Sequence, residues 1–253
     1  MSLLRIAPAA AALLLAACDT RHAPLRIAAA ADLRFALDDL AKSFRRQHGG
    51  IEIAPAYGSS GMFYAQIVNR APFDMYLSAD IQYPRKLAEQ GLTVPGSEFT
   101  YAVGRIVLWT SGSSGIDVER LGMAALRNPA VHHIAIANPA HAPYGRAAEA
   151  AMRSLGVYDA VKDKLVTGEN ISQTLQMAES GAAEVGVVAL SLTMAPGAIG
   201  RCWEIPPGAY PRIEQAGVIL KSAGNPEGAQ AFRAFLLSPE GRAILKRYGF
   251  SGD

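Results

Sequence analysis

From Leu25 onward, short apolar runs of strand length alternate with longer segments that have helical periodicity. The first pair is representative. LRIAAAA at 25–31 has no helical phase, whereas 33–48 carries a single apolar stripe and is stopped by Gly49 and Gly50. Because strands that alternate with helices pair in parallel through helical crossovers, this pattern predicts an α/β fold with mostly parallel sheets.

The same alternation continues to the end of the chain. We expect further strands at 51–57, 74–79, 100–111, 132–138, 185–190 and 213–221, and further helices at 62–69, 83–90, 118–127, 146–156 and 172–181. Two closing helices are marked by Asn225 and Ser238, each followed by proline and an acid, as at a capped helix start. No long linker interrupts the chain, so a second domain would form by the chain crossing over and returning.

The first residues have the features of an export signal. Arg5 precedes an apolar, alanine-rich segment of roughly 12 residues, which is too short to span a bilayer as a helix. It ends in LAAC at 15–18, which resembles the cleavage and acylation signal of bacterial lipoproteins. We therefore expect residues 1–17 to be a lipoprotein-type signal peptide and Cys18 to be lipidated. An ordinary signal peptide that happens to contain Cys18 is the alternative, and both imply export.

The charge and cysteine content of the chain limit the kinds of partner that it can bind. Charges nearly balance, with a formal net charge of +2, so no bulk field favours nucleic acid. Membrane contact is expected only through the lipidated N-terminus, and Asp19 after Cys18 resembles an inner-membrane retention signal. Cys202 is the only later cysteine, which leaves no disulfide framework or cysteine metal cluster. We expect Cys202 to be a small buried residue.

Four strand-to-helix junctions have the composition of anion sites. They are AAAAD at 28–32, GSSG at 58–61, NPAHAPYG at 138–145 and GENIS at 168–172. Ligands of open α/β folds bind beyond the carboxyl ends of strands, and helix N-termini present free N–H groups to anions. Ordinary capping explains any single junction, but four together indicate an anion-binding cleft. His132 and His133 are adjacent in a strand and face opposite ways, which argues against a metal site, and His141 is expected to be a solvated loop residue.

GSSGMFYAQIVNRAPFDMYLSAD, followed by NPAHAPYG and ENIS, resembles the periplasmic molybdate-binding proteins of ABC importers. RIAAAADL, TYAVGRIVLW, VGVVAL and ILKRYGF match at the right intervals, so the resemblance covers nearly all of the mature chain. It implies a type II periplasmic binding protein of two α/β lobes, joined by two crossing strands, that closes on a tetrahedral dianion. On this basis lobe 1 comprises 25–102 plus 203–253 and lobe 2 comprises 103–202, within about ten residues.

The resemblance also implies the ligand contacts. Ser60 matches a serine whose hydroxyl and N–H hold a ligand oxygen, and Ser59 is the adjacent candidate. Tyr144 and Ile171 stand where the family donates backbone N–H groups. Ala31 and Asp32 stand where a small hydroxyl or amide residue is usual. Some relatives use a tyrosine after the GVV strand; Ala189 stands there in this chain, so that contact is expected to be absent.

Asp32 does not fit a dianion site, because a carboxylate repels an anion. Three interpretations remain open. Its side chain caps the helix 33–48 and turns away; or it accepts a proton from a protonated oxyanion or is itself protonated; or it binds a cation or coordinates the metal directly. The last two would change the ligand or its coordination.

The function expected from these features is capture of molybdate or tungstate and delivery to a membrane permease driven by an ATPase. The protein would be periplasmic, anchored by lipid to the inner membrane, and free of cofactors. One alternative is the same fold binding a different oxyanion, such as a protonated phosphate-like species, or a metal with Asp32 in the shell. An exported enzyme acting on phosphate or sulfate esters is another, but the sequence offers no nucleophile with a base and no metal cluster.

Overall fold

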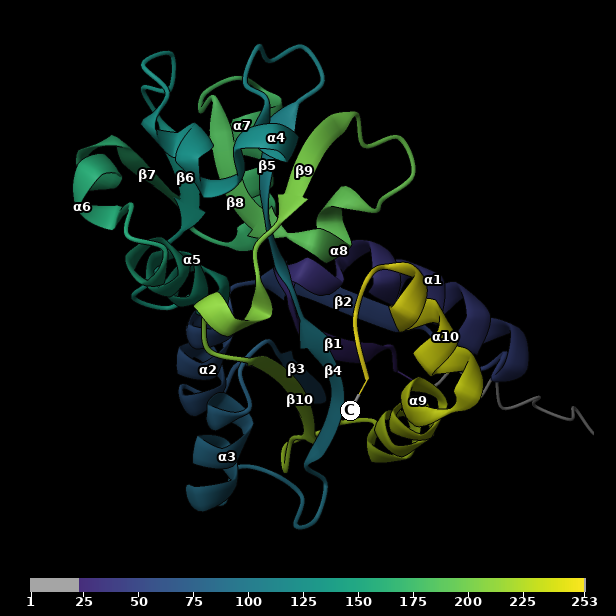
Figure 1. Cartoon of the computed structure of the whole chain (residues 1–253). Coiled ribbons are helices and arrows are strands. Elements are labelled where there is room, and N and C mark those ends of the chain that lie inside the picture. The colour runs from purple at the N-terminus through teal and green to yellow at the C-terminus, as the bar shows by residue number, and fades with distance from the viewer. Residues whose placement is uncertain (1–22, 253) are drawn as a thin grey trace, which may run out of the picture.

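The computed structural model describes residues 23–252 and has two lobes, each built on one five-stranded sheet (Figure 1). The predicted signal peptide and Cys18 lie outside the described residues. The first sheet has the order β2-β1-β3-β10-β4. Its strands are β1 (Leu25–Ala30), β2 (Ile53–Gly58), β3 (Met75–Ser78), β4 (Phe99–Gly104) and β10 (Ile213–Ile219).

The second sheet has the order β7-β6-β8-β5-β9 and forms the upper lobe in Figure 1. Its strands are β5 (Ile106–Ser111), β6 (Ile134–Ala137), β7 (Leu165–Gly168), β8 (Val185–Ala189) and β9 (Gly200–Glu204).

Each sheet is mixed but mostly parallel. In the first, β1 pairs in parallel with β2 and β3, and β10 runs antiparallel between β3 and β4. In the second, β6 pairs in parallel with β7 and β8, and β5 runs antiparallel between β8 and β9. A single strand of each sheet is therefore reversed, which confirms the α/β prediction.

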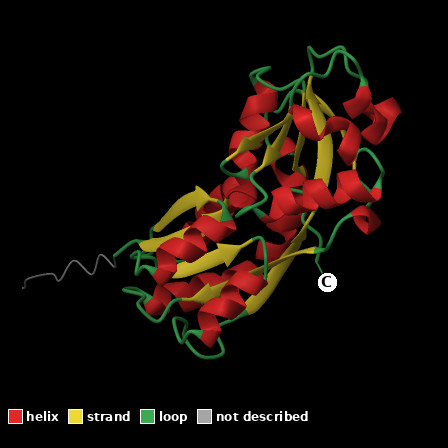
Figure 2. Ribbon diagram, turned by 90° about the vertical axis from the view of Figure 1, so that its left-hand side faces the viewer, coloured by secondary structure: helices red, strands yellow, loops and turns green. Residues whose placement is uncertain are grey.

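Helices cover both faces of the sheets (Figure 2). The first lobe contains α1 (Arg34–Gln47), α2 (Ser60–Val68), α3 (Gln82–Glu89), α9 (Pro226–Leu237) and α10 (Pro239–Arg247). The second contains α4 (Val118–Leu121), α5 (Pro143–Ser154), α6 (Tyr158–Val161), α7 (Ile171–Glu179) and α8 (Leu190–Thr193). Short 3-10 turns are η1 (Ala31–Leu33), η2 (Gly122–Arg127), η3 (Lys162–Lys164) and η4 (Pro207–Ala209). None of the helices within 23–252 has the length and apolarity needed to span a bilayer.

The two faces of the first sheet pack against different sets of helices. Ile27 and Ala29 of β1 pack in one cluster with apolar side chains of α1, α9 and α10. Ala28 between them belongs to a separate cluster with side chains of α2 and α3. Successive strand residues point to opposite faces, so each face of the sheet needs its own helical layer.

The predicted single strand at 100–111 is wrong. The apolar run is two strands, β4 and β5, which belong to different sheets and are separated by Arg105. Both halves are buried, so hydrophobic pattern alone shows no break between them. Arg105 holds this crossing: its guanidinium donates to the carbonyl of Gly249 at 3.1 and 2.9 Å and pairs with Glu204 at 2.8 Å. The chain returns to the first sheet through 205–212.

Other sequence predictions also need correction. The strands β7 and β9 were not anticipated, and the expected helix 118–127 is one turn of α-helix followed by the 3-10 segment η2. β9 is an edge strand whose residues are partly or fully exposed, so it lacks the apolar run by which strands were recognised. Cys202 lies on β9 and is exposed, not buried. Asn225 and Ser238 cap α9 and α10 as predicted.

Candidate functional site

A small cavity of about 10 Å³ lies where the two lobes meet. It lies against the carboxyl ends of strands and the first turns of helices from both lobes. Its lining is Ala30, Ala31, Asp32, Gly58, Ser59, Ser60, Ala79, Ala142, Pro143, Tyr144 and Ile171. The six residues singled out from the sequence are all in this set, and each is buried. No lysine, arginine or histidine is among the described residues that line the cavity.

The start of α2 places two hydroxyls at the cavity. Ser59 is the N-cap, and its Oγ accepts from the amide of Met62 at 3.4 Å. Ser60 Oγ accepts from the amide of Ala79 at 2.9 Å. Because a hydroxyl that accepts still has its own proton to donate, Ser60 retains a donor for a ligand. Ser59 Oγ also lies 2.8 Å from Nδ1 of His141, so it has less capacity left.

Three backbone amides are left over at these helix starts. In α7 the Asn170 cap accepts from the amides of Ser172 and Gln173 at 3.0 and 3.1 Å, which leaves the amide of Ile171 without an acceptor among the described residues. The amides of Ser60 and Tyr144 are in the same position in α2 and α5. First-turn amides have no intrahelical acceptor, so they are available to a ligand with partial positive charge.

Asp32 does not cap α1, which corrects one sequence interpretation. It lies within η1, and neither η1 nor α1 has a side-chain cap. Its side chain is 1% exposed. Oδ2 accepts hydrogen bonds from the Tyr144 hydroxyl at 2.8 Å and from Nε2 of Gln215, whereas Oδ1 has no partner among the described residues.

Burial changes the acidity of this group. Desolvation raises the pKa of Asp32 to about 6, although the hydrogen bonds from Gln215 and Tyr144 and the nearby dipole of its own backbone amide oppose the rise. Burial also raises the pKa of Tyr144 and of Tyr101 well above the usual range, and the Asp32 carboxylate adds to both shifts. The tyrosines are therefore neutral donors at physiological pH.

Gln215 and Tyr101 were not found by sequence reasoning. Tyr101 on β4 donates to Oε1 of Gln215 on β10 at 2.9 Å, and Gln215 is fully buried. The sequence signal was a glutamine inside an otherwise apolar strand. It was ambiguous, because Glu214 beside it is equally polar and only the register decides which of the two points inward.

Direct contacts join the lobes around the cavity. The hydroxyls of Ser172 and Ser191 donate to the carbonyls of Ala31 and Asp32 at 2.9 and 2.8 Å. The amide of Gly61 donates to the carbonyl of His141 at 2.9 Å. His141 is thus held against α2, contrary to the expected solvated loop residue.

An ion pair adds a charged contact between the lobes. Arg146 on α5 and Asp80 after β3 lie 2.6 Å apart. Both side chains remain partly exposed, so the pair lies at the rim and not in the cavity.

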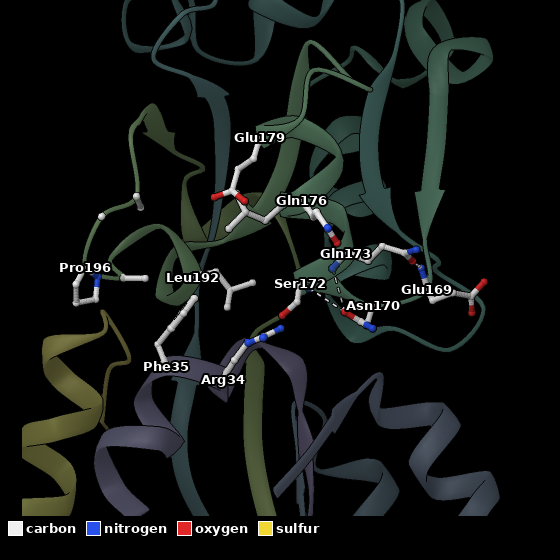
Figure 3. A pocket seen from close by; sticks show the side chains of 14 residues that line it. Arg34, Phe35, Glu169, Asn170, Ser172, Gln173, Gln176, Glu179, Leu192 and Pro196 are labelled. Carbon is white, nitrogen blue, oxygen red and sulfur yellow. Dashed lines mark hydrogen bonds between the residues drawn. The ribbon is translucent and has the colours of Figure 1, made fainter. Parts of the chain in front are cut away.

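A larger groove lies beside the cavity, between α1 of the first lobe and α7 and α8 of the second (Figure 3). Arg34 and Phe35 approach it from one side and Ser172 from the other, while Glu179 and Pro196 mark its rim. It lacks the convergent amides and buried hydroxyls of the cavity. We therefore assign ligand chemistry to the cavity and not to this larger hollow.

The described residues contain no group of three or more histidine, cysteine, aspartate or glutamate side chains arranged to hold a metal ion. A known protein family matches the chain over most of its length. The model of the bacterial extracellular solute-binding proteins matches residues 25–251. The chain belongs to this family. Its members are binding proteins of transport systems and not enzymes.

Relatives of this solute-binding protein are similar over most of their length. The molybdate-binding protein ModA of Rhodobacter capsulatus is 42% identical over 201 residues, which cover 79% of this chain and 78% of the relative. ModA of Azotobacter vinelandii is 39% identical over 238 residues, 93% of each chain. The structure of the Azotobacter vinelandii periplasmic molybdate-binding protein superposes with a TM-score of 0.84 at 36% identity, covering 90% of this chain and 99% of that one.

Proposed function

We propose that this solute-binding protein captures molybdate, or tungstate of the same charge and shape, in the cavity between its lobes. The relatives that are similar to it over most of their length are molybdate-binding proteins. The observation that carries the proposal is a cavity with hydroxyl and amide donors from three helix starts and no cationic side chain among the described residues that line it. Neutral dipoles of this kind suit a fully ionised tetrahedral dianion.

The proposed contacts are divided between the lobes. From the first lobe, Ser60 would donate its hydroxyl and its amide, with Ala31, Asp32 and Ser59 beside the ligand. From the second, Tyr144 and Ile171 would donate amides. Each hydrogen bond to a charged ligand contributes about 1.5–3 kcal/mol. Sulfate has the same charge, so we expect cavity size to select against it, because its central atom forms shorter bonds to oxygen.

Capture would then depend on closure of the lobes around the ligand. We propose that the hinge consists of the two crossings, at Arg105 and within 205–212, close to the lobe boundaries expected at 103 and 203. The loaded protein would deliver its oxyanion to a membrane permease driven by an ATPase. Cys18, if lipidated after removal of 1–17, would hold the protein at the periplasmic face of the inner membrane.

Calorimetry with molybdate, tungstate, sulfate, phosphate and chromate tests the ligand. We expect tight binding of molybdate and tungstate and weak or no binding of sulfate and phosphate. A crystal soaked in tungstate tests the place, because tungsten is visible by its anomalous scattering. A heavy atom elsewhere than beside Ser60, Tyr144 and Ile171 would refute the proposed site, and tighter binding of another oxyanion would refute the proposed ligand.

A further inference from the structure

The two carboxyl oxygens of Asp32 differ in the number of hydrogen bonds that they accept. Oδ2 accepts from Tyr144 and from Gln215, which uses both of its lone pairs, whereas Oδ1 has no partner among the described residues. A carboxylate needs donors at both oxygens when it is buried. A carboxylic acid needs them at only one, because its other oxygen carries the proton and donates. The observed pattern is that of an acid whose Oδ1–H lacks an acceptor.

Neighbouring residues fix this arrangement. Tyr101 donates to Oε1 of Gln215, which turns Nε2 of the amide toward Asp32. Turning the amide over would place Oε1 against an oxygen that already accepts from Tyr144, and two acceptors would then meet. Gln215 and Tyr101 are therefore positioning residues that keep Oδ2 as the accepting end.

Within residues 23–252, no cationic side chain compensates Asp32 from the elements packed around it. The titratable groups that face it are Tyr101 of β4 and Tyr144 of α5, both neutral, while α8 contributes the hydroxyl of Ser191 and α7 that of Ser172. Charged groups on these elements are engaged elsewhere or exposed. Arg146 pairs with Asp80, and Glu214 pairs with Arg212. His141 lies beside Ser59, and its ring is 3.7 Å from Glu169. Arg34 is exposed at the groove.

We propose that Asp32 binds the oxyanion as a neutral carboxylic acid whose Oδ1–H donates a hydrogen bond to a ligand oxygen. This inference rests on the proposed function. When the empty site holds the carboxylate, a proton passes from the solvent to Oδ1 as the dianion enters, and no bond of the ligand is broken. The bound cavity then carries two negative charges in place of three, and Asp32 changes from a repulsive group into a further donor.

Calorimetry of tungstate binding tests this proton count directly. Titrations at one pH in two buffers with different ionisation enthalpies give the number of protons taken up per ligand. At about pH 8 we expect about one proton per tungstate, falling toward zero below about pH 5. The association constant should decrease about tenfold for each pH unit above the midpoint of this titration.

Two variants locate the proton. Asp32→Asn keeps the shape and offers an amide donor, so its tungstate affinity should be independent of pH and its proton uptake zero. Asp163→Asn, which removes an exposed carboxylate of η3 that is not part of the cavity lining, should behave as the wild type. Infrared difference spectra should show the carbonyl band of a protonated carboxyl appearing with tungstate in the wild type and absent from Asp32→Asn.

Three results of these experiments would contradict one of the two proposals. Tight tungstate binding by the wild type with no proton uptake at about pH 8 would overturn it, while leaving the proposed function intact. Proton uptake that persists in Asp32→Asn would place the proton elsewhere and also overturn it. Absence of binding for every oxyanion at every pH would instead refute the proposed function. If Asp32→Asn does not fold, the wild-type proton count and infrared band decide the matter alone.

Discussion

The hydroxyl of Tyr144 donates a hydrogen bond to Oδ2 of Asp32 at 2.8 Å, and this bond joins the two lobes. Tyr144 belongs to the first turn of α5, whereas Asp32 follows β1. Gln215 Nε2 lies 3.1 Å from the same hydroxyl. The cavity is thus supported by a buried polar network that includes side chains from both lobes, so its geometry depends on how the lobes meet.

Ser60→Ala should weaken tungstate binding by about 1–3 kcal/mol, measured by calorimetry. The substitution removes the hydroxyl proposed to donate to the ligand, and it also leaves the amide of Ala79 without its acceptor. Ser180→Ala, which changes an exposed hydroxyl at the end of α7, is the control and should bind as the wild type. Equal affinities for the two variants would exclude Ser60 from the site.

Asp32→Asn should stabilise the ligand-free protein relative to the wild type, and this gain should be larger at neutral pH than at acid pH. The folded-state pKa of Asp32 is raised from 3.8 to about 6, so the folded protein binds more protons than the unfolded chain between these values. The contribution of Asp32 to stability is therefore complete below the lower value and is lost as pH rises through the higher one. Over this pH range, ionisation of Asp32 lowers the free energy of unfolding by about 3 kcal/mol in total.

Urea unfolding of both proteins at about pH 4 and pH 7 checks this prediction. The advantage of Asp32→Asn over the wild type should grow by up to about 3 kcal/mol between the two conditions. Asp163→Asn should show no such growth, because its carboxyl is exposed. A constant difference at both pH values would mean that folding does not raise the pKa of Asp32.

Gly104→Ala should disturb the network below the cavity. A Cβ atom at this position would collide with the Tyr144 hydroxyl and lie 2.9 Å from Nε2 of Gln215. Overpacking of this kind costs about 1–3 kcal/mol of stability, and displacement of Tyr144 should weaken tungstate binding as well. Gly115→Ala, where a Cβ atom would meet nothing within 4 Å, should change neither the unfolding free energy nor the affinity appreciably. If Gly104→Ala has the same stability and tungstate affinity as this control, close packing around Gly104 does not hold Tyr144 and Gln215 in place.

Loss of the ion pair between Arg146 and Asp80 should accelerate ligand release. The two groups lie 2.6 Å apart, and their side chains are 41% and 23% exposed, so solvent screens the pair. Its coupling energy is expected to be at most about 1 kcal/mol, which corresponds to about fivefold in affinity. A double-mutant cycle of Arg146→Met and Asp80→Asn, with stopped-flow release rates at low and high salt, measures it. Coupling that does not decrease with salt would contradict an electrostatic contact at the rim.

Local sequence determined the parts of this protein that depend on neighbours in the chain. The serine pair at 59–60, the Asn225 and Ser238 caps and the periodicity of 33–48 act within one or two turns, so residue type and spacing suffice to predict them. The strand-to-helix junctions at 58–61, 138–145 and 168–172 were also predicted from residue type, and the family resemblance then singled out Ser60, Tyr144 and Ile171 within them. These three residues line one cavity in the folded protein.

The tertiary structure alone decided what lies around Asp32. Its partners are 112 and 183 residues away in the chain, and no local pattern specifies contacts over such separations. Capping was one of three interpretations that the sequence left open, whereas in the structure Asp32 is buried, which raises its pKa, and its side chain accepts hydrogen bonds from two distant donors. The same holds for 100–111, where one apolar run is divided between two sheets, because strand pairing is a property of the assembled sheets and not of the run itself.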